Sequence, residues 1–336
     1  MKKSIFWFFV ITLSLASCGR RSPAGGGERI ITVTIPPFAW FAEEIGSDDF
    51  RVNVLLPPGA DHHIWEPLPA QINALSGSEA FIMNGQLGFE HAWMDRFMQV
   101  NPDMKILDLS RNIQLIGDES LEVVKVEGLK VGGYDSQVEG DEGEGEHDAG
   151  HAGDGDHAAV NAGEGHEDED HAHFQGSPDP HYWMSPEAAR TMAKDVRDFL
   201  AELNPSSSEK YDANLSAVNR KITEVDSLVR ASLGPDPHRT VMIFHPALAY
   251  MGRDYGFEQV SFEDEGKSPS PARMKELIDL AREKEIKIIF IQAEYDVRNA
   301  QSLSRETGAE LVVINPMNSN WPEAVLEVAK AIGNGQ

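Results

Sequence analysis

Short runs of β-branched and aliphatic residues alternate with longer stretches of helical periodicity along most of the chain. This alternation is typical of βαβ units, in which helices join parallel strands. Eight such runs fall into two groups of four. They are residues 29–35, 51–56, 79–84 and 105–109 in the first group, and 240–245, 257–262, 286–292 and 309–315 in the second. The pattern predicts an α/β fold with two domains, each built on a four-stranded parallel sheet.

Two helical patterns lie between the groups of strands. The first follows Ser185, a residue type that caps helix N-termini, and has Pro186 at its first position. The second runs from Glu209 to about Gly234. Its apolar residues recur at helical spacing: Tyr211, Leu215, Val218, Ile222, Val225, Leu228 and Val229. At about 1.5 Å per residue this helix is long enough to run the height of a domain, so we expect it to be a rigid connector.

Residues 127–175 interrupt all periodicity. Between Glu139 and Asp170 the chain holds 13 acidic residues among glycines and alanines, with almost nothing apolar to bury. Such a segment is predicted to be disordered. It contains half of the 12 histidines of the chain, at His147, His151, His157, His166, His171 and His173. We expect these to hold several metal ions weakly near the protein; the alternative is a solvated acidic linker with no metal role.

The N-terminus is typical of an exported protein. Two lysines precede an apolar run from Ile5 to Leu13, which is too short to span a bilayer, and small residues lead to Cys18. The sequence "LASC" resembles a bacterial lipobox, which implies a signal peptide at residues 1–17, lipidation of Cys18 and a flexible leash at residues 18–28. Cys18 is the only cysteine, so no intramolecular disulfide can form.

Length and charge narrow the possible functions. A chain of 336 residues is long for one domain. The formal net charge is −26, and Lys and Arg are nowhere clustered, which argues against a nucleic-acid partner.

Outside the acidic tract six histidines remain, at positions 62, 63, 91, 181, 238 and 245. His63 follows the second predicted strand, His245 ends the fifth, and His181 lies where order returns before a helix. Ligands bind at the carboxyl ends of parallel strands, so these three could meet in a cleft between the domains. Neutral imidazoles dispersed along a sequence suit zinc. Each histidine taken alone is equally well explained as an ordinary hydrogen-bonded loop residue.

Several motifs carry a specific resemblance. In order, they are "PPGADHHIWEPLPAQI", "NGQLGFEHAWMD", "DPHYWMSPEAARTMAKDV", "DANLSAVNRKI", "IFHPALAYMGRDYG" and "EGKSPSPARMKELIDLA". Together they resemble the metal-binding components of bacterial ABC importers, the TroA-like or cluster A-I family, from about Ile30 to Ile332. The resemblance implies two (β/α) domains joined by a long helix, with a metal held between them by His63, His181 and His245. A histidine at the third place and the acidic histidine tract are similar to the zinc-specific, ZnuA-type branch.

The chain departs from that family at two places. Asn315 stands where many relatives have an aspartate, and asparagine is a poor zinc ligand. A water or a neighbouring side chain is then expected at the fourth coordination place. His62 is the best neighbour, although adjacent side chains of an extended segment point apart, and a surface loop histidine is the alternative. Ser268 stands where relatives often have glutamate. This difference affects no ligand, but a side-chain contact that supports a ligand could differ from that in the relatives.

Other residues of the motifs have two interpretations. Glu66 and Asp179 could orient ligand imidazoles, or Asp179 could simply shape a turn before Pro180. The aromatic residues of these motifs could wall the cleft or pack in a core. They are Trp65, Tyr182, Trp183 and Tyr250.

The prediction is an exported zinc-binding protein, lipid-anchored, monomeric and not an enzyme, which delivers Zn²⁺ as cargo to an ABC permease with a separate ATPase. We expect an N-terminal domain at 29–126 and 176–205, the disordered loop at 127–175, the connecting helix at 206–234 and a C-terminal domain at 238–336. Three alternatives remain: an importer component for manganese or another divalent metal, a three-histidine zinc hydrolase or hydratase, and an adhesin or extracellular metal buffer. Against the hydrolase, no HExxH motif and no obvious general base occur.

Overall fold

The computed structural model describes residues 28–117, 178–234, 239–263 and 269–334. All eight predicted strands are present, and each is shorter than predicted by one to three residues. They are β1 (Ile30–Val33), β2 (Arg51–Val54), β3 (Ala80–Met83), β4 (Lys105–Asp108), β5 (Thr240–Ile243), β6 (Glu258–Ser261), β7 (Ile288–Gln292) and β8 (Glu310–Ile314). Every pairing between them is parallel, so the predicted α/β class is confirmed.

The two sheets share one topology. The strand order is β2-β1-β3-β4 in the first and β6-β5-β7-β8 in the second. In each sheet the chain winds to one side of its first strand and then crosses to the other. The carboxyl ends of β1 and β3, and of β5 and β7, are therefore topological switch points, the places where open α/β sheets bind ligands.

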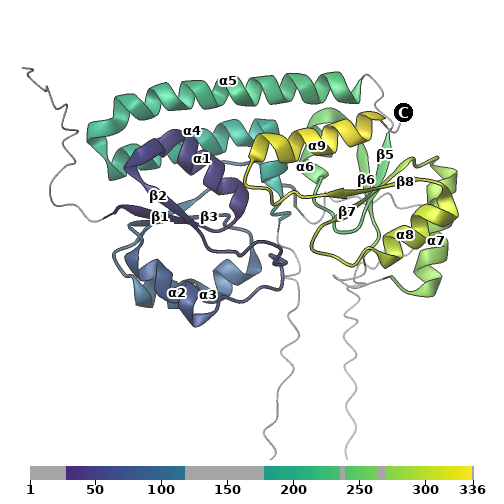
Figure 1. Ribbon diagram of the computed structural model, residues 1–336, viewed down its shortest axis with the longest axis horizontal. Helices are drawn as coiled ribbons and strands as arrows, with labels where there is room; N and C mark the ends of the chain where they lie inside the picture. Colours follow the sequence, from purple (N-terminus) through teal and green to yellow (C-terminus); the bar gives the residue numbers. More distant parts are fainter. Residues whose placement is uncertain (1–27, 118–177, 235–238, 264–268, 335–336) are drawn as a thin grey trace, which may run out of the picture.

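Helices cover both faces of the sheets (Figure 1). In the first half, α2 and α3 lie below the sheet, and α1 and α4 lie above it. The helix bounds in this half are α1 Pro36–Gly46, α2 Pro69–Ala74, α3 Gly88–Val100 and α4 Pro186–Leu203. Those in the second half are α6 Ala249–Tyr255, α7 Pro271–Glu283, α8 Arg298–Thr307 and α9 Trp321–Asn334. Short 3-10 turns lie at Ser47–Asp49, Leu75–Gly77, Tyr182–Met184 and Pro205–Ser207.

The long helix α5 (Ser208–Leu233) runs above both halves, as Figure 1 shows. Its 26 residues span about 39 Å at 1.5 Å per residue. Most of the predicted apolar stripe is buried, whereas Leu228 lies at the edge of the stripe and is 44% exposed. The cap of α4 is also as predicted, because the Ser185 hydroxyl accepts a hydrogen bond from the amide of Ala188 at 3.0 Å. The helix α5 thus joins the two halves, with α4 packed against it on the side of the first sheet.

The last helix, α9, returns from the second sheet to pack on α5 and α1. Its first residue, Trp321, is fully buried against Trp40 and Phe41 of α1. The indole of Trp321 donates a hydrogen bond to the carbonyl of Trp183, while the indole of Trp183 donates to the carbonyl of Pro316. This reciprocal pair joins the two halves through buried polar contacts. One apolar core therefore extends from the first sheet under α5 into the second half.

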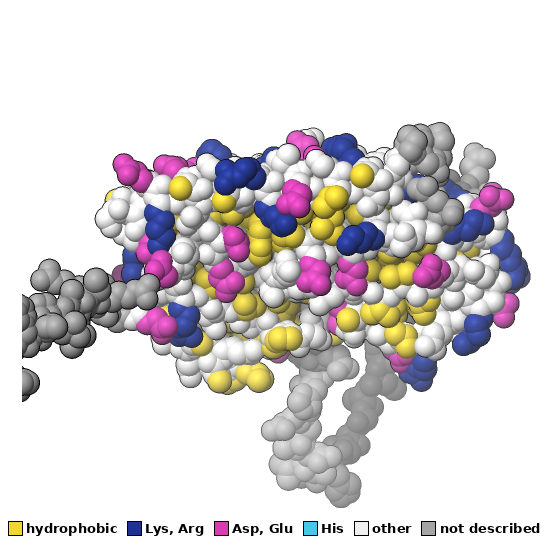
Figure 2. All heavy atoms as spheres, turned by 45° about the horizontal axis from the view of Figure 1, so that its top comes forward, with side chains coloured by type: hydrophobic (Ala, Val, Ile, Leu, Met, Phe, Trp, Pro, Cys, Tyr) yellow, Lys and Arg dark blue, Asp and Glu magenta, His cyan; other side chains and the backbone are white. Residues whose placement is uncertain are grey.

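The face that carries α5 mixes basic and acidic side chains (Figure 2). Lys and Arg are interspersed with Asp and Glu there and form no continuous basic stripe. Within the described part of the chain, no helix combines the length and the apolar character needed to cross a bilayer.

Candidate metal centre

His62 and His63 lie on the loop that follows β2. Asp61 shapes this loop, since its carboxylate accepts a hydrogen bond from the amide of His63 at 2.9 Å and its carbonyl accepts one from Ile64 at 3.3 Å. The segment is therefore a turn, not an extended strand. The expectation that the two side chains point apart is wrong, because the ring centroids of His62 and His63 are 4.1 Å apart.

His181 is presented by the segment that re-enters the first half before α4. Asn84, which follows β3, donates its side-chain amide to the carbonyl of Pro180 at 3.1 Å, and its own carbonyl accepts from the Tyr182 hydroxyl at 2.7 Å. Asp179 Oδ1 accepts hydrogen bonds from both the amide and the Nδ1 of His181, at 2.7 and 2.8 Å. The ring is thereby placed beside the switch point of the first sheet.

His245 lies just beyond β5, at the switch point of the second sheet. The side chain of Gln292, the last residue of β7, accepts a hydrogen bond from the His245 amide and donates one to the His245 carbonyl. The imidazole Nδ1 lies 2.9 Å from Oε1 of Glu263, which follows β6. Three strands of the second sheet thus fix the position of this one ring.

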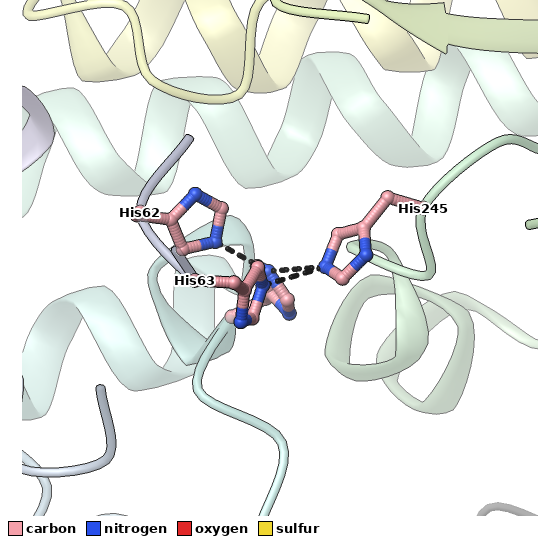
Figure 3. Close-up of side chains that lie close together, drawn as sticks. His62, His63 and His245 are labelled. Carbon is pink, nitrogen blue, oxygen red and sulfur yellow. Dashed lines mark hydrogen bonds between the residues drawn. The ribbon is translucent and has the colours of Figure 1, made fainter. Parts of the chain in front are cut away.

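The four histidines turn their Nε2 atoms toward one another, and Figure 3 shows the rings of His62 and His63, from the loop after β2, converging with that of His245, from the segment after β5. The Nε2–Nε2 distances are 3.0 Å between His62 and His181, 2.8 Å between His63 and His245, and 3.2 Å between His181 and His245. One ligand nitrogen from each ring lies within 4.8 Å of all the others. Four nitrogens at zinc-bond length in a tetrahedron are about 3.3 Å apart, so the group has the size of one zinc coordination sphere.

The carboxylates determine which ring nitrogen is available. With Nδ1–H donating to Asp179 or Glu263, the imidazoles of His181 and His245 present the lone pair of Nε2 to the centre. Burial lowers the pKa of His181, although Asp179 opposes this. Burial, with the nearby rings of His181 and His245, holds the pKa of His62 well below its usual range, so His62 is neutral at pH 7. Burial opposes protonation of His245 as well, but the hydrogen bond and charge of Glu263 prevail and raise its pKa.

The centre is buried and has an excess of negative charge behind it. His62, His181 and His245 are 3%, 2% and 6% exposed. Oδ2 of Asp179 and Oε2 of Glu263 are buried without a hydrogen-bond partner in the described structure. Buried carboxylates are costly unless a positive charge compensates them. Four neutral nitrogens backed by two carboxylates are the donor set and charge that suit a soft divalent cation such as Zn²⁺.

The other predicted residues lie as follows. Asn315 is exposed, and its side-chain oxygen accepts a hydrogen bond from the amide of Met317. Glu66 is also exposed. Trp183 walls the centre, with its ring centroid 5.1 Å from that of His181 and 5.9 Å from that of His62. Several predicted residues lie outside the described part of the chain: Cys18, His147, His151, His157, His166, His171, His173, His238 and Ser268.

Sequence reasoning missed three residues that build the centre. Asp61 turns the histidine loop, and Glu263 and Gln292 hold His245. Glu263 and Gln292 have a signal in retrospect, because both come at the carboxyl end of a predicted strand next to the strand of His245. Their contact with His245 follows from the strand order, which the sequence pattern alone does not provide.

Comparison with known proteins identifies relatives along almost the whole chain. A family model described as "ZnuA: Zinc-uptake complex component A periplasmic" matches residues 31–332. The zinc-binding lipoprotein AdcA of Streptococcus pneumoniae is 26% identical over 95% of this chain and 56% of its own length. The manganese-binding lipoprotein MntA of Halalkalibacterium halodurans is 22% identical over 93% of this chain and 88% of its own. A crystal structure of ZnuA superposes with a TM-score of 0.72, at 29% identity, over 92% of this chain and 99% of that one.

The chain spans little more than half the length of AdcA, since the matched region is 56% of that protein. The four histidines lie within residues 31–332, which the family model matches, and so do the two sheets, apart from Ile30 at the start of β1.

Proposed function

Because this chain belongs to the ZnuA family of periplasmic zinc-uptake components, we propose that it captures Zn²⁺ outside the cytoplasmic membrane and delivers it to an ABC-type permease. The ATPase would be a separate subunit, since the chain has no phosphate-binding GxxxxGK[ST] loop. The single observation that carries the proposal is the convergence of four imidazole nitrogens within 4.8 Å of one another, three from the first half and that of His245 from the second.

In this proposal His63, His181 and His245 are zinc ligands, and His62 is the fourth. Nitrogen donors suit zinc, whereas manganese and other hard cations prefer oxygen. Two buried carboxylates, Asp179 and Glu263, would balance the two positive charges of the ion while remaining outside the coordination sphere. The donor set therefore favours zinc over manganese, although MntA, a relative, is named for manganese.

A binding role is also favoured over hydrolysis. Catalytic zinc sites keep one coordination place open for water, whereas sites with four protein ligands are closed. His62 would fill the place that a hydrolytic water needs. The protein would therefore hold zinc as cargo and perform no chemistry on a substrate.

The proposal includes export, a lipid anchor at Cys18, a monomeric state and weak zinc binding by the histidine-rich tract at 127–175. The domain boundaries of the sequence analysis are kept, with α5 as the connector. Two of these parts have a direct test: mass spectrometry of the mature protein for a lipid at Cys18, and deletion of residues 139–173. The deletion should remove weak zinc equivalents and leave one tight site.

The decisive experiment is a zinc titration of the metal-free protein against a chromophoric chelator. We expect one tight equivalent in the wild type, and none in a His63→Ala, His181→Ala, His245→Ala triple variant. Metal content of the protein purified without added metal should show zinc in preference to manganese. Absence of a tight equivalent, or turnover of ester or hydration substrates by the zinc-loaded protein, would overturn the proposal. Failure of a gene-deletion strain to grow under zinc limitation would separate import from extracellular buffering.

A further inference from the structure

Two segments far apart in the sequence meet beside the metal centre. Ile116, near the end of the first described stretch, accepts a hydrogen bond through its carbonyl from the amide of Asp179 at 2.9 Å. Asp179 is the residue whose side chain holds His181. A backbone contact therefore fixes the base of the segment that presents one ligand imidazole.

One side chain of the second half reaches both of these residues. Tyr250 lies on α6, five positions after His245, and is fully buried. Its hydroxyl accepts a hydrogen bond from the amide of Ile116 at 3.0 Å and donates one to the carbonyl of Asp179 at 2.7 Å. The hydroxyl thus satisfies one backbone donor and one backbone acceptor of the first half.

These contacts form a continuous path to the ligand. Tyr250 fixes the backbone of Asp179, and Asp179 Oδ1 receives both the amide and the Nδ1–H of His181. His245 precedes α6 in the same half. We propose, on the basis of the zinc-binding function proposed above, that Tyr250 is a positioning residue: through Asp179 it sets the orientation of His181 relative to His245, whose ring nitrogen lies 3.2 Å away.

The hydroxyl is the part of Tyr250 that matters. Without it the partly buried amide of Ile116 and the buried carbonyl of Asp179 lose a common partner, which costs free energy and frees the Asp179 backbone to shift. A carboxylate behind a metal-binding imidazole typically changes metal affinity about 10 to 100-fold when it is removed. A displaced Asp179 should have an effect within that range. Burial also raises the pKa of Tyr250, so its hydroxyl stays protonated and can donate at physiological pH.

The chain offers a closely matched control on the same helix. Tyr255, also on α6, donates its hydroxyl to Asp226 of α5 at 2.7 Å. Each of the two tyrosines has an arginine guanidinium over its ring, Arg253 at 5.2 Å from Tyr250 and Arg230 at 4.9 Å from Tyr255. Removal of the Tyr255 hydroxyl breaks a partly buried hydrogen bond of the same helix without touching Ile116 or Asp179.

The test compares Tyr250→Phe and Tyr255→Phe in the full-length protein. We expect Tyr250→Phe to weaken zinc affinity about 10-fold or more and to speed zinc dissociation. It should also change the visible spectrum of the Co²⁺-substituted protein, which reports the ligand geometry. Tyr255→Phe should keep the zinc affinity within about twofold of wild type, even if it lowers the melting temperature as much as Tyr250→Phe does. Equal affinity and an equal cobalt spectrum in wild type and Tyr250→Phe would overturn the inference.

A second measurement uses the unaltered protein and does not depend on the folding of a variant. Binding free energies are reciprocal, so zinc must strengthen the contact that helps to hold it. We expect zinc to slow hydrogen exchange at the amide of Ile116 more than at the amide of Asn204, which is bonded to Leu200 at the end of α4. Equal slowing at both amides would contradict the inference. If the wild type bound no zinc at all, the proposed function itself would fail. That outcome differs from an unchanged zinc affinity in Tyr250→Phe and from equal slowing of exchange at the two amides, which contradict only the inference about Tyr250.

Discussion

Replacement of His62 by alanine tests whether the centre has four protein ligands or three. Burial keeps the pKa of His62 low, so the ring is neutral; its Nδ1 has no hydrogen-bond partner in the described structure, and its Nε2 lies 3.0 Å from that of His181. His62→Ala therefore leaves no buried charge unpaired. Any large effect on zinc binding must then come from the bound state.

The magnitude follows from the coordination number. Four-ligand zinc sites bind with about 10 to 16 kcal/mol at neutral pH, or about 2.5 to 4 kcal/mol per ligand. A water molecule can take the coordination place of His62 and restore part of the lost binding free energy, so the low end of the range per ligand applies. Since each 1.4 kcal/mol is tenfold in affinity, we expect His62→Ala to weaken zinc binding roughly 50 to 100-fold.

The assay is competition with a chelator of known zinc affinity, combined with thermal unfolding in excess chelator to isolate the metal-free contribution. His91→Ala is the control, because His91 contacts the carbonyl of Gly85 and is not a member of the four-histidine group. His91→Ala should leave the affinity unchanged. If His62→Ala binds zinc within about threefold of wild type, the reasoning fails and the centre is a three-histidine site with an open place.

Three further predictions test the surroundings of the centre. Asp179→Ala and Glu263→Ala should each weaken zinc binding about 10 to 100-fold in the same competition assay, since each carboxylate orients one imidazole; an unchanged affinity in both would contradict that role. Burial raises the pKa of Glu90 from 4.5 to about 7. The folded protein then binds a proton that the unfolded chain has released, so stability should fall by about 3 kcal/mol as pH rises through this window, and urea unfolding should show that this fall is absent in Glu90→Gln. Ile222→Ala on α5 removes a fully buried side chain and should cost about 2 to 5 kcal/mol in urea unfolding with the zinc affinity unchanged; a loss below 1 kcal/mol would mean that α5 does not contribute to the core.

The strands were predictable because buried parallel strands have a strong local signal. Continuous apolar runs are an example: residues 288–291, bounded by Lys287 and Gln292, lie in β7 (Ile288–Gln292), all of whose residues are buried. The predicted ends were too long because the residues that follow a strand can stay extended without pairing. Thr34 and Phe262 are examples, since both still make backbone hydrogen bonds to a neighbouring segment beyond the end of their strands.

The centre was predictable only in part. His63 and His245 follow from strand ends, His181 from its place just before a helix, and all three from the family resemblance; the structure brings their rings together. The turn that brings His62 beside His63 is closed by a hydrogen bond from the His63 amide to the side chain of Asp61, which hydrophobic periodicity cannot reveal. Glu263 is 18 residues from His245 in sequence and meets it only because β6 pairs with β5. The local sequence pattern thus indicates which segments carry the histidines. The pairing of strands in the folded protein determines which side chains orient them.

The return of α9 over the first half has a consequence for the order of folding. Trp321 lies 138 residues after its partner Trp183, and it also fills the surface of α1 formed by Trp40 and Phe41. Contacts of such long sequence separation form late, because the intervening chain must first be ordered. During synthesis the aromatic surface of α1 therefore stays exposed until α9 has emerged from the ribosome. A chain truncated before α9 would leave that surface bare and should be prone to aggregation and degradation, although it retains all four histidines.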